Sequence, residues 1–147
     1  MRYSRRMRGL TLPEIATVMV IMGLVASIAI HPMNHALDRA AVDEGAQRYG
    51  AMFETARAFA VARARQSRLE LDTVRAVALI ELRRTQNAWD TVDQRPLGRA
   101  RIGASATLVT FSSLGVGLGL SNGRIIFSRG NAADTLTISR TGRLKRF

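Results

Sequence analysis

Few residues of this chain have the types and spacing that catalysis or metal binding requires. His31 and His35 are four residues apart and could share a helix face, but two ligands are too few for a zinc site. Asp90 and Asp93 could bind calcium only with further oxygen ligands. The glycines of residues 115–119 lack the spacing of a dinucleotide-binding turn, and cysteine is absent, which excludes thiolate chemistry. We therefore expect no catalytic residue, no metal and no cofactor, and we do not expect an enzyme.

The arginine-rich C-terminal region is the strongest candidate for a binding surface. The chain carries 22 Lys and Arg residues against 11 Asp and Glu residues, a net charge of +11. Residues 94–147 hold nine of the basic residues and only one acid, Asp134. Such a surface attracts nucleic-acid phosphate through counterion release, and arginine adds bidentate contacts. The candidate contacts are Arg124, Arg129, Arg140, Arg143, Lys145 and Arg146. The same charges could instead protect a solvated or subunit-facing edge strand from aggregation.

Glu14 lies near the start of an apolar run that carries no other charge. The run extends from Leu10 to Ile30, and as a helix it would span roughly 31 Å, which matches the apolar core of a bilayer. Four arginines precede the run and the charges after it cancel, so the N-terminus is expected in the cytoplasm and the rest of the chain outside. A carboxylate in hydrocarbon costs on the order of 2.5–3.5 kcal/mol and usually has a function and a partner. If Glu14 instead lay near the headgroups, its side chain could reach water, and inserting the helix would cost little free energy.

The segment Arg8-Gly9-Leu10-Thr11-Leu12-Pro13-Glu14 resembles the type III signal of type IV pilins and type II secretion pseudopilins. The resemblance implies that a prepilin peptidase cleaves after Gly9, that Leu10 becomes an N-methylated N-terminus, and that Glu14 is fifth in the mature chain. Leu10 replaces the commoner Phe of the family. In a filament core, the carboxylate of Glu14 would pair with the free amine of a neighbouring Leu10, because a buried carboxylate without a partner is strongly unfavourable.

Two other interpretations of the N-terminus stay open. One is an ordinary secretory signal, for which Ser27-Ile28-Ala29 would supply a small-x-small cleavage site. The other is a plain single-span anchor. The acid within the apolar run and the length of the run both argue against a secretory signal.

The spacing of apolar residues after the run predicts one helix and then a series of strands. A stripe with a period of four, typical of an amphipathic helix, covers residues 31–66 and comprises Leu37, Ala41, Gly45, Tyr49 and Phe53, widened by Met52, Ala56, Phe59 and Ala60. The predicted strands are Leu69–Thr73, Ala76–Leu82, Ala88–Val92, Thr107–Phe111, Gly123–Ser128, Thr135–Arg140 and Arg143–Phe147. Strands laid on the apolar stripe of one long helix give an α+β fold.

Two turns are predicted between the last three strands. Residues 130–134 indicate a hairpin loop, and Thr141-Gly142 indicates a tighter turn. In the final strand, Arg143 and Lys145 would point to one face and Arg146 to the other.

Four segments of the C-terminal half resemble the GspH/FimT family, which contains the type H minor pseudopilin of type II secretion and its type IV pilus relatives. They are Ala56-Arg57-Ala58-Phe59-Ala60, Trp89, the pair Gly123–Phe127 and Thr135–Ile138, and Gly142-Arg143-Leu144-Lys145. The resemblance implies a type IV pilin-like fold and a minor subunit at or near a filament tip. It also adds Gly142 to the candidate nucleic-acid contacts, because the Gly-Arg-x-Arg tail is the plausible contact in relatives linked to DNA uptake. Here Lys145 replaces the final Arg, which keeps the charge and loses the bidentate fork.

We therefore expect four regions and an assembly function. Residues 1–9 would be a leader peptide, 10–30 a transmembrane or filament-core helix, 31–66 an amphipathic helix and 67–147 a periplasmic antiparallel β-domain. The first expectation is a minor pseudopilin of a type II secretion pseudopilus, made in the inner membrane and assembled into a periplasmic or surface filament. The alternative is a FimT-like type IV pilus minor pilin that binds DNA for uptake through its basic C-terminal strand. The expected partners are other pseudopilins or pilins, the prepilin peptidase, the inner membrane and, in the alternative, DNA.

Overall fold

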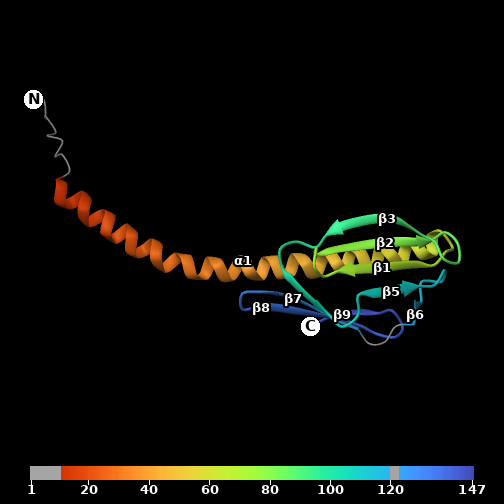
Figure 1. Cartoon of the computed structure of the whole chain (residues 1–147). Helices are drawn as coiled ribbons and strands as arrows, with labels where there is room; N and C mark the ends of the chain where they lie inside the picture. The colour runs from red at the N-terminus through yellow and green to blue at the C-terminus, as the bar shows by residue number, and fades with distance from the viewer. Residues whose placement is uncertain (1–10, 120–122) are drawn as a thin grey trace, which may run out of the picture. The chain divides into compact units, whose positions relative to one another are not determined.

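The computed structural model describes residues 11–119 and 123–147, with the backbone alone for residues 28–32. A long helix, α1 (Leu12–Ala62), is followed by short strands (Figure 1). The chain divides into two compact units, the first ending at Asn34 and the second running from His35 to Phe147. We call them the N-terminal unit and the C-terminal unit, and α1 contributes to both.

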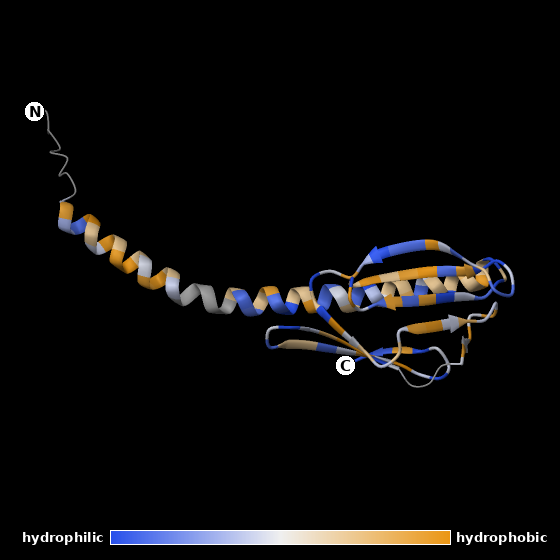
Figure 2. Ribbon diagram, viewed as in Figure 1, coloured by the Kyte–Doolittle hydropathy of each residue, from blue (hydrophilic) through white to orange (hydrophobic). Residues whose placement is uncertain are grey.

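The described part of the N-terminal unit is the first stretch of α1, and it is mostly apolar (Figure 2). Its large apolar side chains are exposed, namely Leu12, Ile15, Val18, Met19, Val20, Ile21, Met22, Leu24 and Val25. Within the part of the chain that the structure describes, no helix combines the length and the apolar character needed to cross a membrane.

Two antiparallel sheets accompany α1 in the C-terminal unit. The first sheet has the strand order β3-β2-β1-β5-β6, and the second sheet has the order β4-β7-β8-β9. The strands are β1 (Ser67–Asp72), β2 (Val77–Arg83), β3 (Trp89–Pro96), β4 (Arg101–Ala104), β5 (Leu108–Phe111), β6 (Gly117–Leu118), β7 (Gly123–Arg129), β8 (Ala132–Ile138) and β9 (Leu144–Arg146). The chain thus enters the second sheet with β4, returns to the first with β5 and β6, and ends in the second.

The core lies where both sheets meet the second half of α1. The buried apolar face of α1 consists of Ala41, Val42, Ala46, Tyr49, Met52, Phe53, Ala56 and Ala60. Phe53 meets Phe111 of the first sheet edge-on, with ring centroids 5.0 Å apart. Tyr49 meets Phe127 of the second sheet with centroids 6.4 Å apart. The predicted α+β fold, with strands laid on the amphipathic part of a long helix, is confirmed.

Gly45 determines how closely α1 approaches the second sheet. A Cβ at this position would lie 2.7 Å from the Phe127 ring and 3.0 Å from the Leu97 carbonyl oxygen. A larger residue would therefore push the helix and β7 apart. Leu37, which was predicted to continue the same stripe, is 57% exposed, so the packed face begins one turn later, at Ala41.

The helix ends at Ala62, before the predicted bound at residue 66. Ala64 adopts a left-handed φ of 48°, and the amide of Arg65 donates back to the carbonyl of Ala60 at 3.1 Å. This reversal ends the helix in the way a C-terminal glycine usually does. It also leads into β1, where the buried Ser67 hydroxyl donates to the Ala56 carbonyl of α1 at 2.6 Å.

The predicted strands are all present with shifted ends, and β4 and β6 were not predicted. The predicted loop at residues 130–134 is too long, because the turn consists of Gly130 and Asn131, and Ala132 already pairs with Arg129. Gly130 has a φ of 54°, which suits the first position of a two-residue type II′ hairpin turn. The shorter turn moves Asp134 into β8, where it is buried. At its other end β8 stops at Ile138 instead of residue 140, because Ser139 begins the next turn, where its carbonyl accepts from the Gly142 amide at 3.0 Å.

Candidate functional site

Glu14 closes the first turn of α1 through a hydrogen-bonded cap that was not predicted from the sequence. The backbone N–H and the hydroxyl of Thr11 both donate to Oε2 of Glu14, at 2.9 and 2.8 Å. The Thr11 carbonyl in turn accepts from the Glu14 amide at 3.0 Å. Thr11 is thus the N-cap, and Glu14, the third helical residue, supplies the half of a capping box in which the acid accepts from the N-cap N–H. Among the described residues nothing donates to Oε1 of Glu14, so one carboxylate oxygen stays free for a partner.

Arg146 is held against α1 by two carboxylates. Its Nε donates to Asp134 at 2.5 Å, and its Nη2 contacts Asp43 of α1. The hydrogen bond to Asp43 raises the pKa of the Arg146 guanidinium, and Asp134 adds to that effect while desolvation opposes it. As predicted, Arg146 points to the opposite face of β9 from Lys145, which lies across from Thr137 on the outer face.

Arg129 is paired in the same manner at the other end of the β7–β8 hairpin. Its Nε lies 3.0 Å from Oδ1 of Asp38 on α1. The hairpin turn is close to the same acid, because a Cβ at Gly130 would collide with the Asp38 carboxylate. The predicted basic residues therefore do not form one patch, since Arg129 and Arg146 are engaged with acids of the helix.

Three of the predicted basic residues line one cavity on the outer face of the second sheet. The register sets Arg124 of β7 opposite Thr137 of β8, and Thr137 opposite Lys145 of β9. The cavity has a volume of about 660 Å³, and Arg143 and Ser139 complete its polar lining. None of its described lining residues is acidic. Three cations and two hydroxyls in one cavity suit phosphate or carboxylate groups.

The same outer face carries residues that were not predicted from the sequence. The Phe147 side chain is 69% exposed, and Nζ of Lys145 lies 4.5 Å from the centre of its ring, within cation–π range. Arg101 of β4 lies opposite Ser128 of β7 and is exposed. The alternation of polar Arg101 and apolar Ile102 was the available signal, but Gly103 and Ala104, which are unfavourable in strands, follow at once.

Comparison with solved structures places this arrangement among known folds, although no protein-family model and no curated protein matches the chain. The type IV minor pilin FimU of Pseudomonas aeruginosa, in two crystal forms, superposes with TM-scores of 0.61 and 0.59 at 17% and 16% identity. The matches cover 73% and 71% of this chain and 88% and 91% of those chains. The minor pseudopilin EpsH from the Type 2 Secretion System of Vibrio cholerae superposes with a TM-score of 0.59 at 12% identity, over 72% of this chain and 95% of that chain.

The chain has a type IV pilin-like fold. The predicted type IV pilin-like architecture, a long N-terminal helix packed against an antiparallel β-domain, is thereby confirmed. The predicted cleavage site of this pilin-like chain, Gly9 and Leu10, lies outside the described residues, so cleavage and methylation stay predictions.

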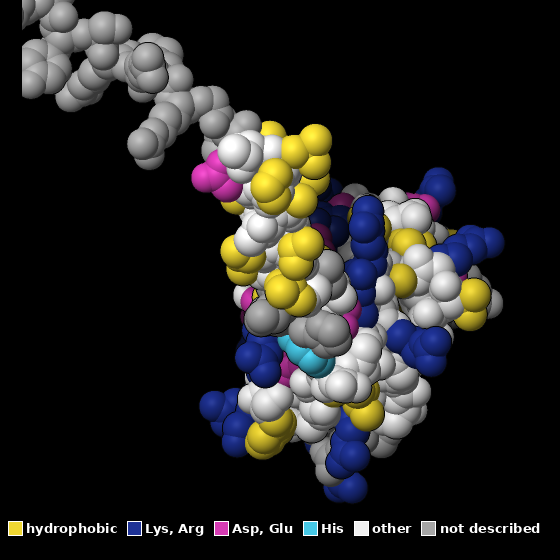
Figure 3. Space-filling model, turned by 90° about the vertical axis from the view of Figure 1, so that its left-hand side faces the viewer, with side chains coloured by type: hydrophobic (Ala, Val, Ile, Leu, Met, Phe, Trp, Pro, Cys, Tyr) yellow, Lys and Arg dark blue, Asp and Glu magenta, His cyan; other side chains and the backbone are white. Residues whose placement is uncertain are grey.

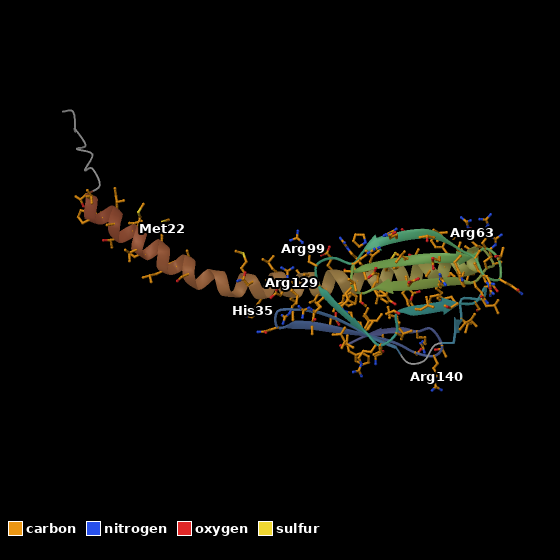
Figure 4. The ribbon with its side chains drawn as sticks, viewed as in Figure 1. Met22, His35, Arg63, Arg99, Arg129 and Arg140 are labelled. Carbon is orange, nitrogen blue, oxygen red and sulfur yellow. The ribbon has the colours of Figure 1, made fainter. Side chains whose placement is uncertain are left out.

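Gly142 serves the turn between β8 and β9 of this pilin-like fold. It is buried and has a φ of 73°, and a Cβ there would lie 3.0 Å from the backbone nitrogen of Gly117 in β6. A left-handed residue in close contact with another backbone requires glycine. Arg140, beside the same turn, is exposed and lies well apart from Arg129 (Figure 4).

The other polar candidates from the sequence are exposed or paired. His35 is exposed, and the side chain of His31 lies outside the described part of the chain. Asp90 and Asp93 project from β3 toward arginines, with contacts of 3.8 Å to Arg84 and 3.0 Å to Arg95. The described residues contain no group of three or more side chains placed to hold a metal ion.

Proposed function

We propose that this chain is a minor subunit of a pilin-type filament, with a structural role in assembly. The observation that carries the proposal is the contrast within α1. Residues 41–60 present a face that is packed under two sheets, whereas the apolar side chains of residues 12–25 are exposed. Exposed apolar surface of this extent marks a membrane or a protein partner. The minor pilin FimU and the minor pseudopilin EpsH, which share the fold, support a filament as that partner.

Before assembly, the subunit would be anchored once in the inner membrane with the C-terminal unit in the periplasm. The apolar run of the sequence extends from Leu10 to Ile30, beyond the side chains that the structure describes, and a run of that length suffices for one span. The arginines of residues 1–9 support a cytoplasmic N-terminus. A prepilin peptidase would then remove the leader after Gly9 and leave Leu10 as the methylated N-terminus.

In the filament, Glu14 would pair with the amine of a neighbouring Leu10. The Thr11 cap holds Oε2 and so orients the carboxylate, while Oε1 is available to the amine. An ionised carboxylate without a partner in an apolar core is strongly unfavourable. The pairing would therefore set the register between adjacent subunits.

Glu14→Gln tests this role without destroying the cap, because glutamine also serves at the third position of a capping box. We expect the variant to be found in the membrane fraction in normal amount and to be absent from sheared filaments. Glu44→Gln is the matched control, since Glu44 is an exposed acid on the same helix that pairs with Arg48 at 2.6 Å. Normal incorporation of Glu14→Gln would exclude the assigned role.

The mature N-terminus provides a second test of the proposal. Intact-mass measurement of the chain from membranes should give the mass of residues 10–147 plus one methyl group. An unprocessed chain, or one cut near residue 29, would contradict the pilin-type signal.

A type II secretion pseudopilus is our first assignment of the system, with the subunit at or near the tip. The fold neighbours include a pilus protein and a secretion protein, with similar TM-scores, so the assignment needs a cellular test. Deleting the gene should reduce secretion of type II substrates and leave pilus-dependent motility and DNA uptake intact. The reverse pattern would favour the pilus system.

The outer face of the second sheet favours a second candidate, a minor pilin that binds DNA. Arg124, Arg143 and Lys145 line one acid-free cavity, and Phe147 offers an exposed aromatic ring beside Lys145. Cations and an aromatic ring on one face suit nucleic acid.

Duplex binding by the chain in mild detergent, measured against salt concentration, tests this second candidate. Replacing Arg124, Arg143 and Lys145 with glutamine should flatten the dependence of log K on log salt by about 0.9 for each phosphate that the variant no longer neutralises. The matched control replaces three exposed arginines near the C-terminal end of α1, Arg57 in the helix and Arg63 and Arg65 just after it, and should keep the slope. Equal slopes for both triple variants would contradict a DNA-binding role for this face.

A further inference from the structure

A second arginine-lined cavity lies at the end of the C-terminal unit where α1 enters it. Arg99, Arg101 and Arg129 line this cavity, together with Ser128 and Gly130 at the β7–β8 turn. Its volume is about 320 Å³, and none of its described lining residues is acidic. Arg99 and Arg129 lie beside the first turns that α1 contributes to this unit (Figure 4). We call it the entry cavity.

Two of the three arginines are free to bind a ligand. Arg129 is paired with Asp38, whereas Arg99 and Arg101 are exposed and form no ion pair with any residue in the described ranges. The acids of the adjacent helix face are already engaged, with Glu44 on Arg48 and Asp43 on Arg146. The excess charge at the entry cavity is therefore not neutralised within the chain, and Figure 3 shows Lys and Arg side chains spread over the surface of this unit. Two guanidinium groups at an acid-free cavity match the geometry of a phosphate group.

A mixed surface with an aliphatic part adjoins the entry cavity. A neighbouring cavity of about 490 Å³ shares Arg99 and Arg129 with it, and one face of α1 supplies most of the rest of its lining, namely the aliphatic Leu37, Ala40 and Ala41 and the paired Glu44 and Arg48. Leu37 is 57% exposed. Arginine and exposed aliphatic side chains together are typical of surfaces that sit at a lipid headgroup layer.

The distance along the chain also points to a membrane surface. Eight residue steps of α1 lead from Ile30, the last residue of the apolar run, to Asp38, which contacts the β7–β8 turn. They rise by about 12 Å, and the headgroup layer is roughly 5–8 Å thick on each side of the hydrocarbon core. Arginine side chains at this position can therefore reach headgroup phosphates. The cavity that Arg124 lines is a separate one, because Arg124 lies four residues before Ser128 in β7, roughly 13 Å away.

We propose that the entry cavity binds the phosphate of an anionic phospholipid in the periplasmic leaflet of the inner membrane, while the subunit waits there for assembly. The inference rests on the proposed membrane-anchored precursor and adds a headgroup partner to it. Docking on the headgroups would hold the C-terminal unit against the bilayer, and extraction into a filament would release it.

Amide hydrogen exchange of the full chain reconstituted in lipid vesicles tests the proposal. In vesicles containing phosphatidylglycerol, the amides of residues 98–102 and 128–131 should exchange more slowly than in pure phosphatidylcholine. The attraction of two arginines to an anionic surface predicts slowing of up to roughly 25-fold at low salt. The slowing should disappear in the double variant Arg99→Gln, Arg101→Gln and at high salt. The matched control, Arg124→Gln with Lys145→Gln, should retain it.

Each other result of this experiment has one meaning. If the chain floats with both kinds of vesicle and exchange is identical, the headgroup site is wrong and the membrane anchor stands. If the chain floats with neither, the anchor itself is wrong and the headgroup site fails with it. If duplex DNA slows exchange at these residues and anionic lipid does not, the cavity is a nucleic-acid site and the proposal is overturned.

Discussion

Both sheets of the C-terminal unit bury an apolar inner face against α1. Their outer faces differ in charge. On the first sheet, Arg68 of β1 pairs with Glu81 of β2 and lies 4.5 Å over the ring of Trp89. On the second sheet, the cations Arg124 and Lys145 have hydroxyl neighbours and no described acid beside them. The first outer face is thus neutralised by its own strands, while the second keeps an unbalanced charge.

The sheets also attach to α1 by different contacts. The first sheet uses the edge-on contact of Phe53 with Phe111 and a buried hydrogen bond from the Ser67 hydroxyl to the Ala56 carbonyl. The second sheet uses the close approach at Gly45 and two arginine–aspartate pairs, Arg129 with Asp38 and Arg146 with Asp43. The difference indicates that the first sheet is mainly a structural support, whereas the second carries cations on its outer face that no described acid neutralises. Four predictions test how far this division holds.

The largest effect is expected from removing the aromatic contact of either sheet with the helix. Phe127→Ala and Phe111→Ala should each lower the free energy of unfolding by about 3–5 kcal/mol, because both rings are fully buried against α1. Urea unfolding of the chain in mild detergent, followed by circular dichroism, measures the decrease. A single transition in both variants means that the sheets unfold together. Two separate transitions would show that they are independent.

Gly45→Ala tests the close approach of α1 to the second sheet alone. The new Cβ would lie 2.7 Å from the Phe127 ring, so unfolding should become easier by about 1–3 kcal/mol. Gly50→Ala is the matched control on the same helix, since its Cβ would meet only Leu144, at 3.7 Å, and should be neutral or stabilising by up to about 1 kcal/mol. Equal effects of the two variants would show that the second sheet is not held by this contact.

Tyr49 makes the contact with the second sheet sensitive to alkaline pH. Burial raises the pKa of the Tyr49 hydroxyl above its usual value. The unfolded chain then loses this proton near pH 10 while the folded chain keeps it, so stability is constant below about pH 10 and falls above it by up to about 1.4 kcal/mol per pH unit. Tyr49→Phe should reduce that fall in urea unfolding at pH 9 to 11. An unchanged slope would place the titrating group elsewhere.

The smallest effect concerns the turns on either side of β1 in the first sheet. Ala64 and Ala76 have φ values of 48° and 52°, a conformation that is unfavourable for alanine and open to glycine. Ala64→Gly and Ala76→Gly should therefore stabilise the unit by roughly 0.5–1 kcal/mol each, measured by thermal unfolding. Ala60→Gly, in the buried helix interior, is the control and should destabilise it. A lower melting temperature for both turn variants would contradict the strained geometry.

Much of the fold was predictable because it depends on local periodicity. The stripe through Ala41, Gly45, Tyr49 and Phe53 predicted the packed face of α1, and alternation predicted most of the strands. The exact ends were not predictable, since Ala64 rather than a glycine reverses the chain after α1. β6 has only two residues, and β4 has a single large apolar residue beside Gly103 and Ala104, so neither carries a strand pattern.

The candidate surfaces were predictable only in part. The sequence identified Glu14 as the acid of the apolar run, but its capping partner Thr11 emerged from the geometry of the first turn. It also identified the basic C-terminal region, but it did not distinguish Arg129 and Arg146, which are paired with acids of α1, from Arg124, which lines a cavity without described acids. A two-residue turn at Gly130 instead of a longer loop extends β8 to include Asp134, whose buried carboxylate accepts from Arg146.

The amino-acid sequence by itself determined the apolar run with its single acid and the amphipathic stripe, because each depends only on residues close together in the chain. It also determined the total charge, which is a simple sum over the residues. The tertiary structure alone decided which of those charges are available. Arg146 meets Asp43 across 103 residues of sequence, and Arg129 meets Asp38 only because the β7–β8 hairpin reaches α1. Ion pairing depends on distances in space that register and packing set, so the free arginines at the entry cavity and on the outer face became apparent only in the folded chain.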